Sequence, residues 1–146
     1  MKQLLFVALF ISSCTTELNK TTSSNPTQEK LLSGAWKRTA TSVITKDNNT
    51  ENETFSNGLP CQKDNLYIFN TDHTYTTDEG DVKCFVDEPQ RQSNSTWRAD
   101  GKHLYMILSE EEGEVEFLYE IVSLTASTLK LKRDVDKLIF LEEYTR

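Results

Sequence analysis

The chain contains little of several residue types on which common functions depend. Its 146 residues include two histidines, five glycines and three prolines, so histidine-based metal or acid–base chemistry has little material and collagen-like or proline-rich architectures are excluded. Basic residues are also few, because 16 Lys and Arg stand against 23 Asp and Glu, a net charge of −7. A nucleic-acid-binding surface needs clustered Lys and Arg, so we expect no nucleic-acid partner. The mean hydropathy of −0.56 excludes several membrane spans, and the length favours one folded domain.

Residues 1–13 have the features of a lipoprotein signal peptide. A basic start at Lys2 is followed by the apolar run 4–11 (LLFVALFI) and two small serines. A spanning helix needs about 20 apolar residues, so this run is too short to be a membrane anchor itself. The tetrad 11–14 (ISSC) resembles the bacterial lipobox, whose cysteine is acylated and becomes the new N-terminus. The resemblance implies a lipid anchor at Cys14 that holds the protein to a membrane; the alternative is an ordinary signal peptide with an incidental cysteine.

The residues after Cys14 indicate the location and the tether. Thr15 stands where lipoproteins retained at the inner membrane usually carry Asp, so the resemblance implies an outer-membrane lipoprotein of the cell envelope. Residues 14–28 are rich in Thr, Ser and Asn and cannot bury enough apolar surface to fold. We therefore predict a flexible tether at 14–28 and a folded domain at 29–146, with one short helical turn over Gln28–Leu32.

Two cysteines, Cys61 and Cys84, remain once Cys14 is acylated. An even number of cysteines in an oxidising envelope predicts a disulfide, and the sequence offers no cluster of further Cys or His ligands for zinc. The chain between them is predicted to form a hairpin. If its turn centres on Asp72 and His73, the two cysteines face each other, so we expect a cross-strand bond, in register, at the open end of the hairpin.

Segments of β-type composition or period-two alternation fill the rest of the chain. The clearest alternates the apolar Val115, Phe117 and Tyr119 with Glu116 and Glu120. The predicted strands are Ala35–Thr45, Asn65–Asn70, His73–Thr77, Asn94–Ala99, His103–Leu108, Glu114–Val122, Ser127–Arg133 and Lys137–Tyr144. Such spacing without intervening helices implies an antiparallel sandwich or barrel. In an up-and-down order the long connections, 46–64 and 78–93 among them, share one end, which indicates an eight-stranded barrel with a loop-rimmed mouth.

An ordered series of short motifs resembles the lipocalins and the lipocalin-like lipoproteins of bacterial envelopes. The motifs are G-x-W at 34–36, CQKDNL at 61–66, FNTD at 69–72, Cys84, STW at 95–97, DGK at 100–102, and YEIVSLT at 119–125 followed by LKL at 129–131. The resemblance implies an all-β, eight-stranded antiparallel up-and-down barrel in which Trp36 plugs the closed end. Two residues depart from the pattern: His73 replaces a turn glycine, and Arg38 shares the face of Trp36, which makes the lumen less apolar.

The inward-facing apolar side chains can either fill the barrel or surround a ligand. The expected inward set is Trp36, Ala40, Phe117, Tyr119, Ile121, Leu129 and Leu131. If a cavity exists, Phe117 and Leu131 lie toward the mouth and are the first candidate ligand-binding residues. Tyr67 and Leu108 are further candidates.

Two functions from different classes are compatible with these features. The first is a lipid-anchored, lipocalin-like lipoprotein that binds a small hydrophobic or amphipathic molecule non-covalently. The second is an interaction lipoprotein with a filled barrel, such as an inhibitor of a basic cell-wall hydrolase, whose acidic loops form the contact surface. The sequence has no paired catalytic groups and no metal-ligand or cofactor motif, and His73 and His103 are interpreted as solvated turn residues. We therefore expect a monomeric non-enzyme without a cofactor.

Overall fold

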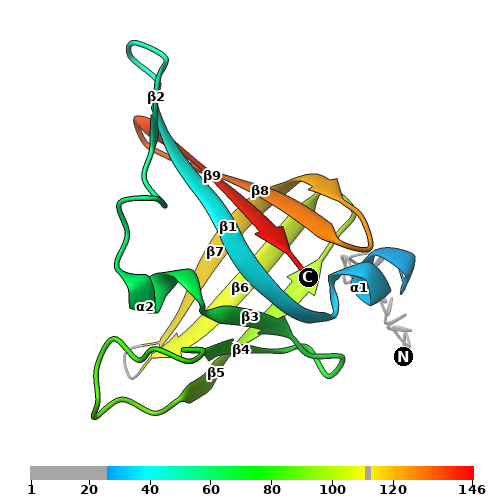
Figure 1. Ribbon diagram of the computed structural model, residues 1–146. Coiled ribbons are helices and arrows are strands. Elements are labelled where there is room, and N and C mark those ends of the chain that lie inside the picture. Colours follow the sequence, from blue (N-terminus) through cyan, green and yellow to red (C-terminus); the bar gives the residue numbers. More distant parts are fainter. Residues whose placement is uncertain (1–25, 111–112) are drawn as a thin grey trace, which may run out of the picture.

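The computed structural model describes residues 26–110 and 113–146. Cys14, the signal peptide and most of the tether lie outside the described residues. The elements in chain order are α1 (Pro26–Leu32), β1 (Gly34–Thr45), β2 (Thr50–Glu53), α2 (Pro60–Lys63), β3 (Leu66–Phe69), β4 (Thr74–Asp78), β5 (Arg91–Ala99), β6 (His103–Glu110), β7 (Gly113–Leu124), β8 (Thr128–Val135) and β9 (Leu138–Thr145) (Figure 1). Neither helix among these residues is long and apolar enough to cross a membrane.

Eight of the strands form a closed antiparallel barrel, which confirms the predicted fold class. Neighbours pair in the order β3 to β9 along the chain. The long strand β1 closes the barrel, because it pairs with β3 through Gly34–Lys37 on one side and with β9 through Lys37–Thr45 on the other. A closed barrel leaves few unpaired edges. The helical turn expected at Gln28 begins earlier, at Pro26, since proline is favoured in the first turn of a helix.

The connection 46–64 contains two elements that the sequence pattern did not indicate. Strand β2 pairs with the far part of β1, between Ser42 and Thr45, beyond the stretch that β3 occupies (Figure 1). A tight turn makes this hairpin: Asn49 has a left-handed φ of 52°, and Asn48 Oδ1 accepts a hydrogen bond from the Thr50 amide at 3.1 Å. Asparagine tolerates the left-handed conformation, and its side chain readily accepts a hydrogen bond from the backbone two residues later. The short helix α2 follows and leads into β3.

The hairpin of β3 and β4 has a different register from the predicted one. Its turn is closed by the Asn70 amide, which donates to the Thr74 carbonyl at 2.9 Å, so three residues lie in the loop and Phe69 faces Tyr75. His73 adopts a φ of 66° in this turn, the conformation that a glycine would favour. The expected cross-strand position of the two cysteines is therefore wrong. The disulfide itself is confirmed: Cys61 in α2 is bonded to Cys84 in the β4–β5 connection.

A β-bulge in β1 reverses the expected direction of Ala40. The pairing with β9 shifts between Arg38 and Ala40, so Ala40 lies opposite Glu143. Glu143 points outward, where its carboxylate pairs with Lys130 at 2.7 Å. Because a bulge adds one residue to one strand, every later side chain of that strand changes face. Ala40, expected inside, is therefore on the outer face.

The closed end of the barrel is built around Trp36. Its side chain is fully buried, and its indole Nε1 donates to the Leu32 carbonyl of α1 at 2.7 Å. The buried cluster around it consists of Leu32, Phe69, Trp97, Ala99, Leu104, Tyr119, Leu129, Leu131 and Tyr144. The three turns β3–β4, β5–β6 and β7–β8 lie at this same end; for example, the Gly101 amide of the β5–β6 turn donates to Gln28 Oε1 of α1 at 2.9 Å. Helix α1 thus caps the bottom of the barrel.

Arg146 fastens α1 to the barrel, a role that the sequence did not indicate. Its guanidinium carbon lies 4.1 Å from the Trp36 ring centroid. Three of its nitrogens donate to backbone carbonyls: Nη1 to Ser33 at 2.7 Å, Nη2 to Leu31 at 2.8 Å and Nε to Ala126 at 2.7 Å. The guanidinium therefore joins the helix, the start of β1 and the β7–β8 turn. Gly34, at the start of β1, has a φ of 120°, a conformation that L side chains rarely adopt, and a Cβ atom there would also lie 2.9 Å from Arg146 Nη1.

We expect Arg146→Ala to lower the free energy of unfolding by about 2 kcal/mol, since it removes charge-assisted hydrogen bonds and a ring contact together. Urea denaturation followed by tryptophan fluorescence measures the change. Arg98→Ala is the matched control, because Arg98 also covers a ring, that of Tyr105 at 3.4 Å, but on the outer face of the barrel. A loss no larger than that of the control contradicts the fastening role.

Candidate functional site

A cavity lies in the barrel lumen, above the buried cluster of the closed end. Its volume is about 170 Å³. It is lined by side chains from four successive strands, namely Tyr75, Ser95, Met106, Leu108, Phe117 and Tyr119. Strand alternation puts them there, since Met106 pairs with Phe117 and Leu104 with Tyr119 on the same inward face. The lining is apolar and aromatic with a few hydroxyl groups, which suits a small organic molecule.

The structure places the four predicted ligand-binding residues at different depths. Phe117 and Leu108 line the cavity. Leu131 belongs to the buried cluster, with 2% of its surface exposed. Tyr67 packs edge-on against Tyr144, with the ring centroids 5.4 Å apart. The structure thus brings two of the four to one cavity, and contact with a ligand stays a prediction for all of them.

Four inward-facing tyrosines surround the middle of the lumen. Tyr75 and Tyr119 line the cavity, and Tyr67 and Tyr144 lie beside it. Burial raises the pKa of all four hydroxyls, that of Tyr119 to about 12. Tyrosine is already neutral at physiological pH, and burial disfavours its ionised form further, so each hydroxyl keeps its proton.

The lumen also contains an ion pair. Arg38 Nη1 lies 3.7 Å from Glu142 Oε1, and their side chains are 23% and 15% exposed. The other oxygen of Glu142 accepts a hydrogen bond from the Tyr144 hydroxyl at 2.7 Å. The guanidinium carbon of Arg38 also lies over the Tyr67 ring, 5.2 Å from its centroid. The expectation that Arg38 makes the lumen less apolar holds, and Glu142 is the partner that the sequence did not indicate.

A second arginine, Arg133 of β8, lies further toward the mouth. Its guanidinium carbon is 5.6 Å from the ring centroids of Phe117 and Tyr119 and 5.0 Å from that of Phe140. Its Nε atom is buried without a hydrogen-bond partner. The sequence could have indicated that Arg133 points inward, because Leu129, Leu131 and Arg133 lie two residues apart and share one face of β8.

The connection between β4 and β5 forms part of the rim of the mouth. It is held at its base by Asp64, whose Oδ2 accepts from the Asp81 and Val82 amides at 2.8 and 2.9 Å. Gly80 is required there, since its φ is 67° and a Cβ would come within 2.6 Å of the Asp64 carbonyl oxygen. The disulfide fixes the same connection to α2. The tip exposes Val82, Phe85 and Val86.

Asp78 at the end of β4 holds the other side of this rim. Its carboxylate accepts from Gln90 Nε2 at 2.8 Å, Arg91 Nε at 2.6 Å and the Gly80 amide at 3.0 Å. The Asp78–Arg91 pair extends β5 back to Arg91, three residues before the predicted start. The hydrogen bond from Gln90, and then that from Arg91, lower the pKa of Asp78 below its ordinary value.

Acidification should therefore destabilise the rim. A carboxyl group with a lowered folded-state pKa stabilises the fold above its unfolded pKa of about 4, and this contribution is lost as the pH falls through the folded value. We expect Asp78→Asn to be less stable than the wild type at pH 7, with the difference shrinking below about pH 4. Thermal unfolding from pH 2 to 7 measures it, with Asp87→Asn in the exposed part of the connection as control. Parallel pH profiles for Asp78→Asn and wild type contradict the assignment.

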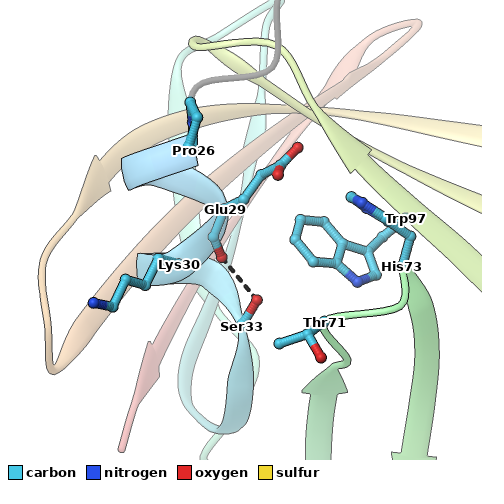
Figure 2. A pocket seen from close by; sticks show the side chains of 7 residues that line it. All are labelled: Pro26, Glu29, Lys30, Ser33, Thr71, His73 and Trp97. Atoms are coloured by element: carbon cyan, nitrogen blue, oxygen red, sulfur yellow. Dashed lines mark hydrogen bonds between the residues drawn. The ribbon is translucent and has the colours of Figure 1, made fainter.

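A second hollow, of about 240 Å³, lies outside the barrel at its closed end. Figure 2 shows it between α1 and the β3–β4 turn, with Glu29 and Ser33 on the helix side and His73 and Trp97 opposite. The Ser33 hydroxyl donates to the Glu29 carbonyl at 2.8 Å, and the His73 ring packs on Trp97 at 5.2 Å. These contacts stabilise helix α1 and the β3–β4 turn. None of the side chains that line this hollow is a buried charged group without a partner.

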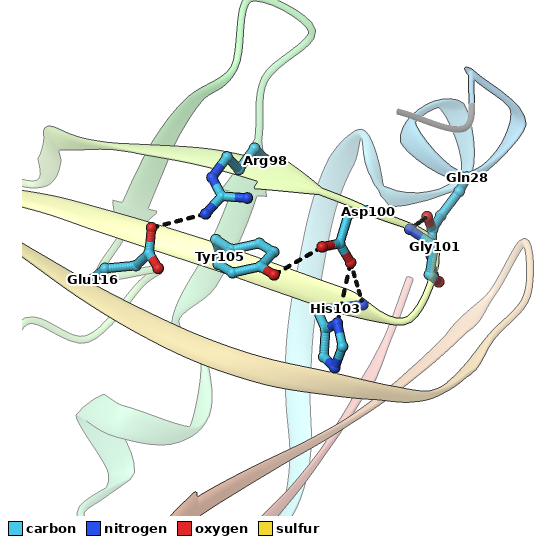
Figure 3. Close-up of polar contacts among 7 residues, drawn as sticks. All are labelled: Gln28, Arg98, Asp100, Gly101, His103, Tyr105 and Glu116. Carbon is cyan, nitrogen blue, oxygen red and sulfur yellow. Dashed lines mark hydrogen bonds and ion pairs between the residues drawn. The ribbon is translucent and has the colours of Figure 1, made fainter. Parts of the chain in front are cut away.

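The outer face of β5, β6 and β7 carries a polar cluster that supports the closed end (Figure 3). Asp100 accepts from the Tyr105 hydroxyl at 2.8 Å and lies 3.1 Å from His103 Nδ1. Arg98, above Tyr105, pairs with Glu116 at 3.0 Å. His103 is thus engaged with the turn that it follows. Within the described residues, no group of three His, Cys, Asp or Glu side chains is arranged to hold a metal ion.

The comparison with protein families agrees with this architecture. The comparison with protein families matches residues 32–131 to a lipocalin-like domain. Among solved structures, the chain is similar to a lipocalin-like protein from Bacteroides uniformis, with 12% sequence identity, a TM-score of 0.44, and coverage of 77% of this chain and 96% of that chain. The comparison with curated proteins gives no match. The matched segment runs from the last residue of α1 into β8 and includes every strand that lines the cavity.

Proposed function

Because this chain belongs to the lipocalin-like domain family, we propose that it binds a small hydrophobic or amphipathic molecule non-covalently in its lumen. The observation that carries the proposal is the cavity of about 170 Å³ lined by Phe117, Leu108 and their neighbours. An apolar cavity of roughly 150 Å³ accommodates benzene, so a ligand of this size, or the end of a longer one, fits. A barrel filled by its own side chains would leave no such space.

The test combines ligand detection with a matched pair of variants. Leu108→Trp fills the cavity, whereas Leu118→Trp places the same ring on the outer face of β7, where Leu118 is 49% exposed. Native mass spectrometry of the purified chain detects a co-purifying molecule, and titration with 1-octanol followed by amide chemical shifts detects binding directly. We expect binding in the wild type and in Leu118→Trp and its loss in Leu108→Trp. A wild-type chain that carries no molecule and binds neither 1-octanol nor octanoate contradicts the proposal.

The same proposal includes a lipid anchor at Cys14 and a place in the outer membrane. The lipobox-like tetrad and Thr15 support it. Pro26, the first described residue, enters α1 at the closed end (Figure 1), so a chain tethered from that side leaves the mouth free. Mass spectrometry of the mature N-terminus tests the anchor, and membrane fractionation of wild type and Cys14→Ala tests the location. An unmodified N-terminus at a residue other than Cys14 contradicts the anchor.

The interaction function is a second candidate because of the exposed tip of the rim. Phe85 and Val86 are 64% and 88% exposed, and the acidic Asp87 and Glu88 follow them. An exposed apolar group bordered by charge is typical of a protein contact. This function would be favoured over ligand binding if the barrel binds no ligand but captures a basic protein, and if Phe85→Asp abolishes that capture.

A further inference from the structure

We propose that the lumen selects ligands with a negative charge, and that Arg133 binds their carboxylate. This inference rests on the proposed function and deepens it, since it names the chemical class of the ligand. It depends on the charges inside the barrel and on the positions of the rings around Arg133.

Arg133 has no acidic partner within the barrel. Within residues 26–110 and 113–146, no hydrogen bond or ion pair joins its side chain to another residue, and its Nε atom is both buried and unpaired. A guanidinium nitrogen removed from water, as this Nε atom is, normally has a carboxylate or a carbonyl partner, because the loss of hydration is costly. Three aromatic rings compensate in part, but they give the buried Nε donor no hydrogen-bond acceptor.

Glu142, the inward-facing carboxylate of β9, is already engaged elsewhere. One oxygen pairs with Arg38 and the other accepts from the Tyr144 hydroxyl. The tyrosines of the lumen are neutral at physiological pH and provide no negative charge, and burial raises their pKa values further. Arg38 thus has a carboxylate partner in Glu142, whereas no described residue forms an ion pair with Arg133, and the unpaired positive charge lies there. An anionic ligand would complete the pairing that the chain itself leaves open.

The rings beside Arg133 link this charge to the cavity. Phe117 and Tyr119 line the cavity, and both lie 5.6 Å from the guanidinium carbon. A ligand whose carboxylate is bound to Arg133 thus places its apolar part against these two rings. The cavity of about 170 Å³ limits that apolar part to one ring or a short alkyl chain. The ligand class is therefore a small apolar monocarboxylate.

The test uses three molecules of equal chain length and different charge: octanoate, 1-octanol and octylamine. Isothermal titration of the purified full-length chain measures each dissociation constant. We expect octanoate to bind at least about ten-fold more tightly than 1-octanol, because charge-assisted hydrogen bonds are the strong ones, and octylamine to bind most weakly. Equal binding of octanoate and 1-octanol, or tighter binding of octylamine, overturns the inference and leaves ligand binding intact. If none of the three binds, both the inference and the proposed function fail.

Variants assign the effect to Arg133. Arg133→Met keeps a long apolar side chain and removes the charge, so it should weaken octanoate at least about ten-fold and leave 1-octanol unchanged. Arg133→Lys should retain part of the preference, since a lysine is a point charge without the planar fork. Arg98→Met is the matched control, because Arg98 covers Tyr105 on the outer face and pairs with Glu116. An octanoate affinity unchanged in Arg133→Met overturns the assignment. If that variant does not fold, the comparison of the three molecules on the wild type still decides the proposal.

Discussion

Replacing Trp36 with alanine should lower the free energy of unfolding by about 3–5 kcal/mol, the range for removing a large buried aromatic side chain. The residue is fully buried at the bottom of the barrel. Its loss would open a cavity, leave the Leu32 carbonyl without the indole donor, and remove the surface on which Arg146 lies. Because α1 is held by these same contacts, we expect the helix to detach before the barrel unfolds.

Urea denaturation measured by far-UV circular dichroism tests this result. Trp36→Phe keeps an apolar ring without the hydrogen bond and should lose less than the alanine variant. Leu118→Ala is the control for truncating an exposed side chain of the barrel, and its effect should stay within about 0.5–1 kcal/mol. A Trp36→Ala protein as stable as Leu118→Ala would show that the closed end does not depend on this side chain.

Removing the disulfide with Cys61→Ala and Cys84→Ala together should cost about 3 kcal/mol. The bond spans a sequence separation of 23 residues, and closing a loop of that length restricts the unfolded chain by roughly this free energy. The loss should be larger for the rim than for the closed end, because Cys84 lies in the connection that Asp64 and Asp78 hold. Replacing both cysteines avoids a free thiol.

Reduction provides the internal control for this prediction. A reductant should lower the thermal midpoint of the wild type to that of the double variant and leave the variant unchanged. Amide hydrogen exchange locates the effect, with faster exchange expected in 79–90 than around Trp36. A double variant as stable as the oxidised wild type contradicts the prediction.

The barrel could be predicted from the sequence because its strands obey a simple alternation. The outline of eight strands and the pairing of Cys61 with Cys84 needed only periodicity and cysteine number. The register of strand pairing was harder to predict than the number of strands. One extra residue in the turn at His73 shifted the β3–β4 pairs, and one extra residue after Arg38 turned Ala40 outward. Single-residue insertions leave little trace in a hydrophobic pattern, yet they change every later facing pair.

The candidate site was predicted only in its apolar part. Phe117 and Leu108 line the cavity as expected from inward alternation near the mouth. Arg133 and Glu142 also occupy inward positions, but charged residues are ordinarily assigned to the solvent face. Their partial burial depends on the rings of Phe117, Tyr119 and Phe140 and on Arg38, which come from other strands. Only the assembled barrel shows these contacts.

The closure between β1 and β9 has a consequence for how the chain acquires its fold. Lys37 at the bottom of β1 pairs with Thr145 at the end of β9, more than a hundred residues later. Such long-range pairing makes folding slow relative to helical proteins of the same size. During synthesis, the edge of β1 that pairs with β9 therefore stays unpaired until β9 has been made. Until then the incomplete sheet has an unpaired edge to which another strand can add, so aggregation is most favoured in the steps before closure.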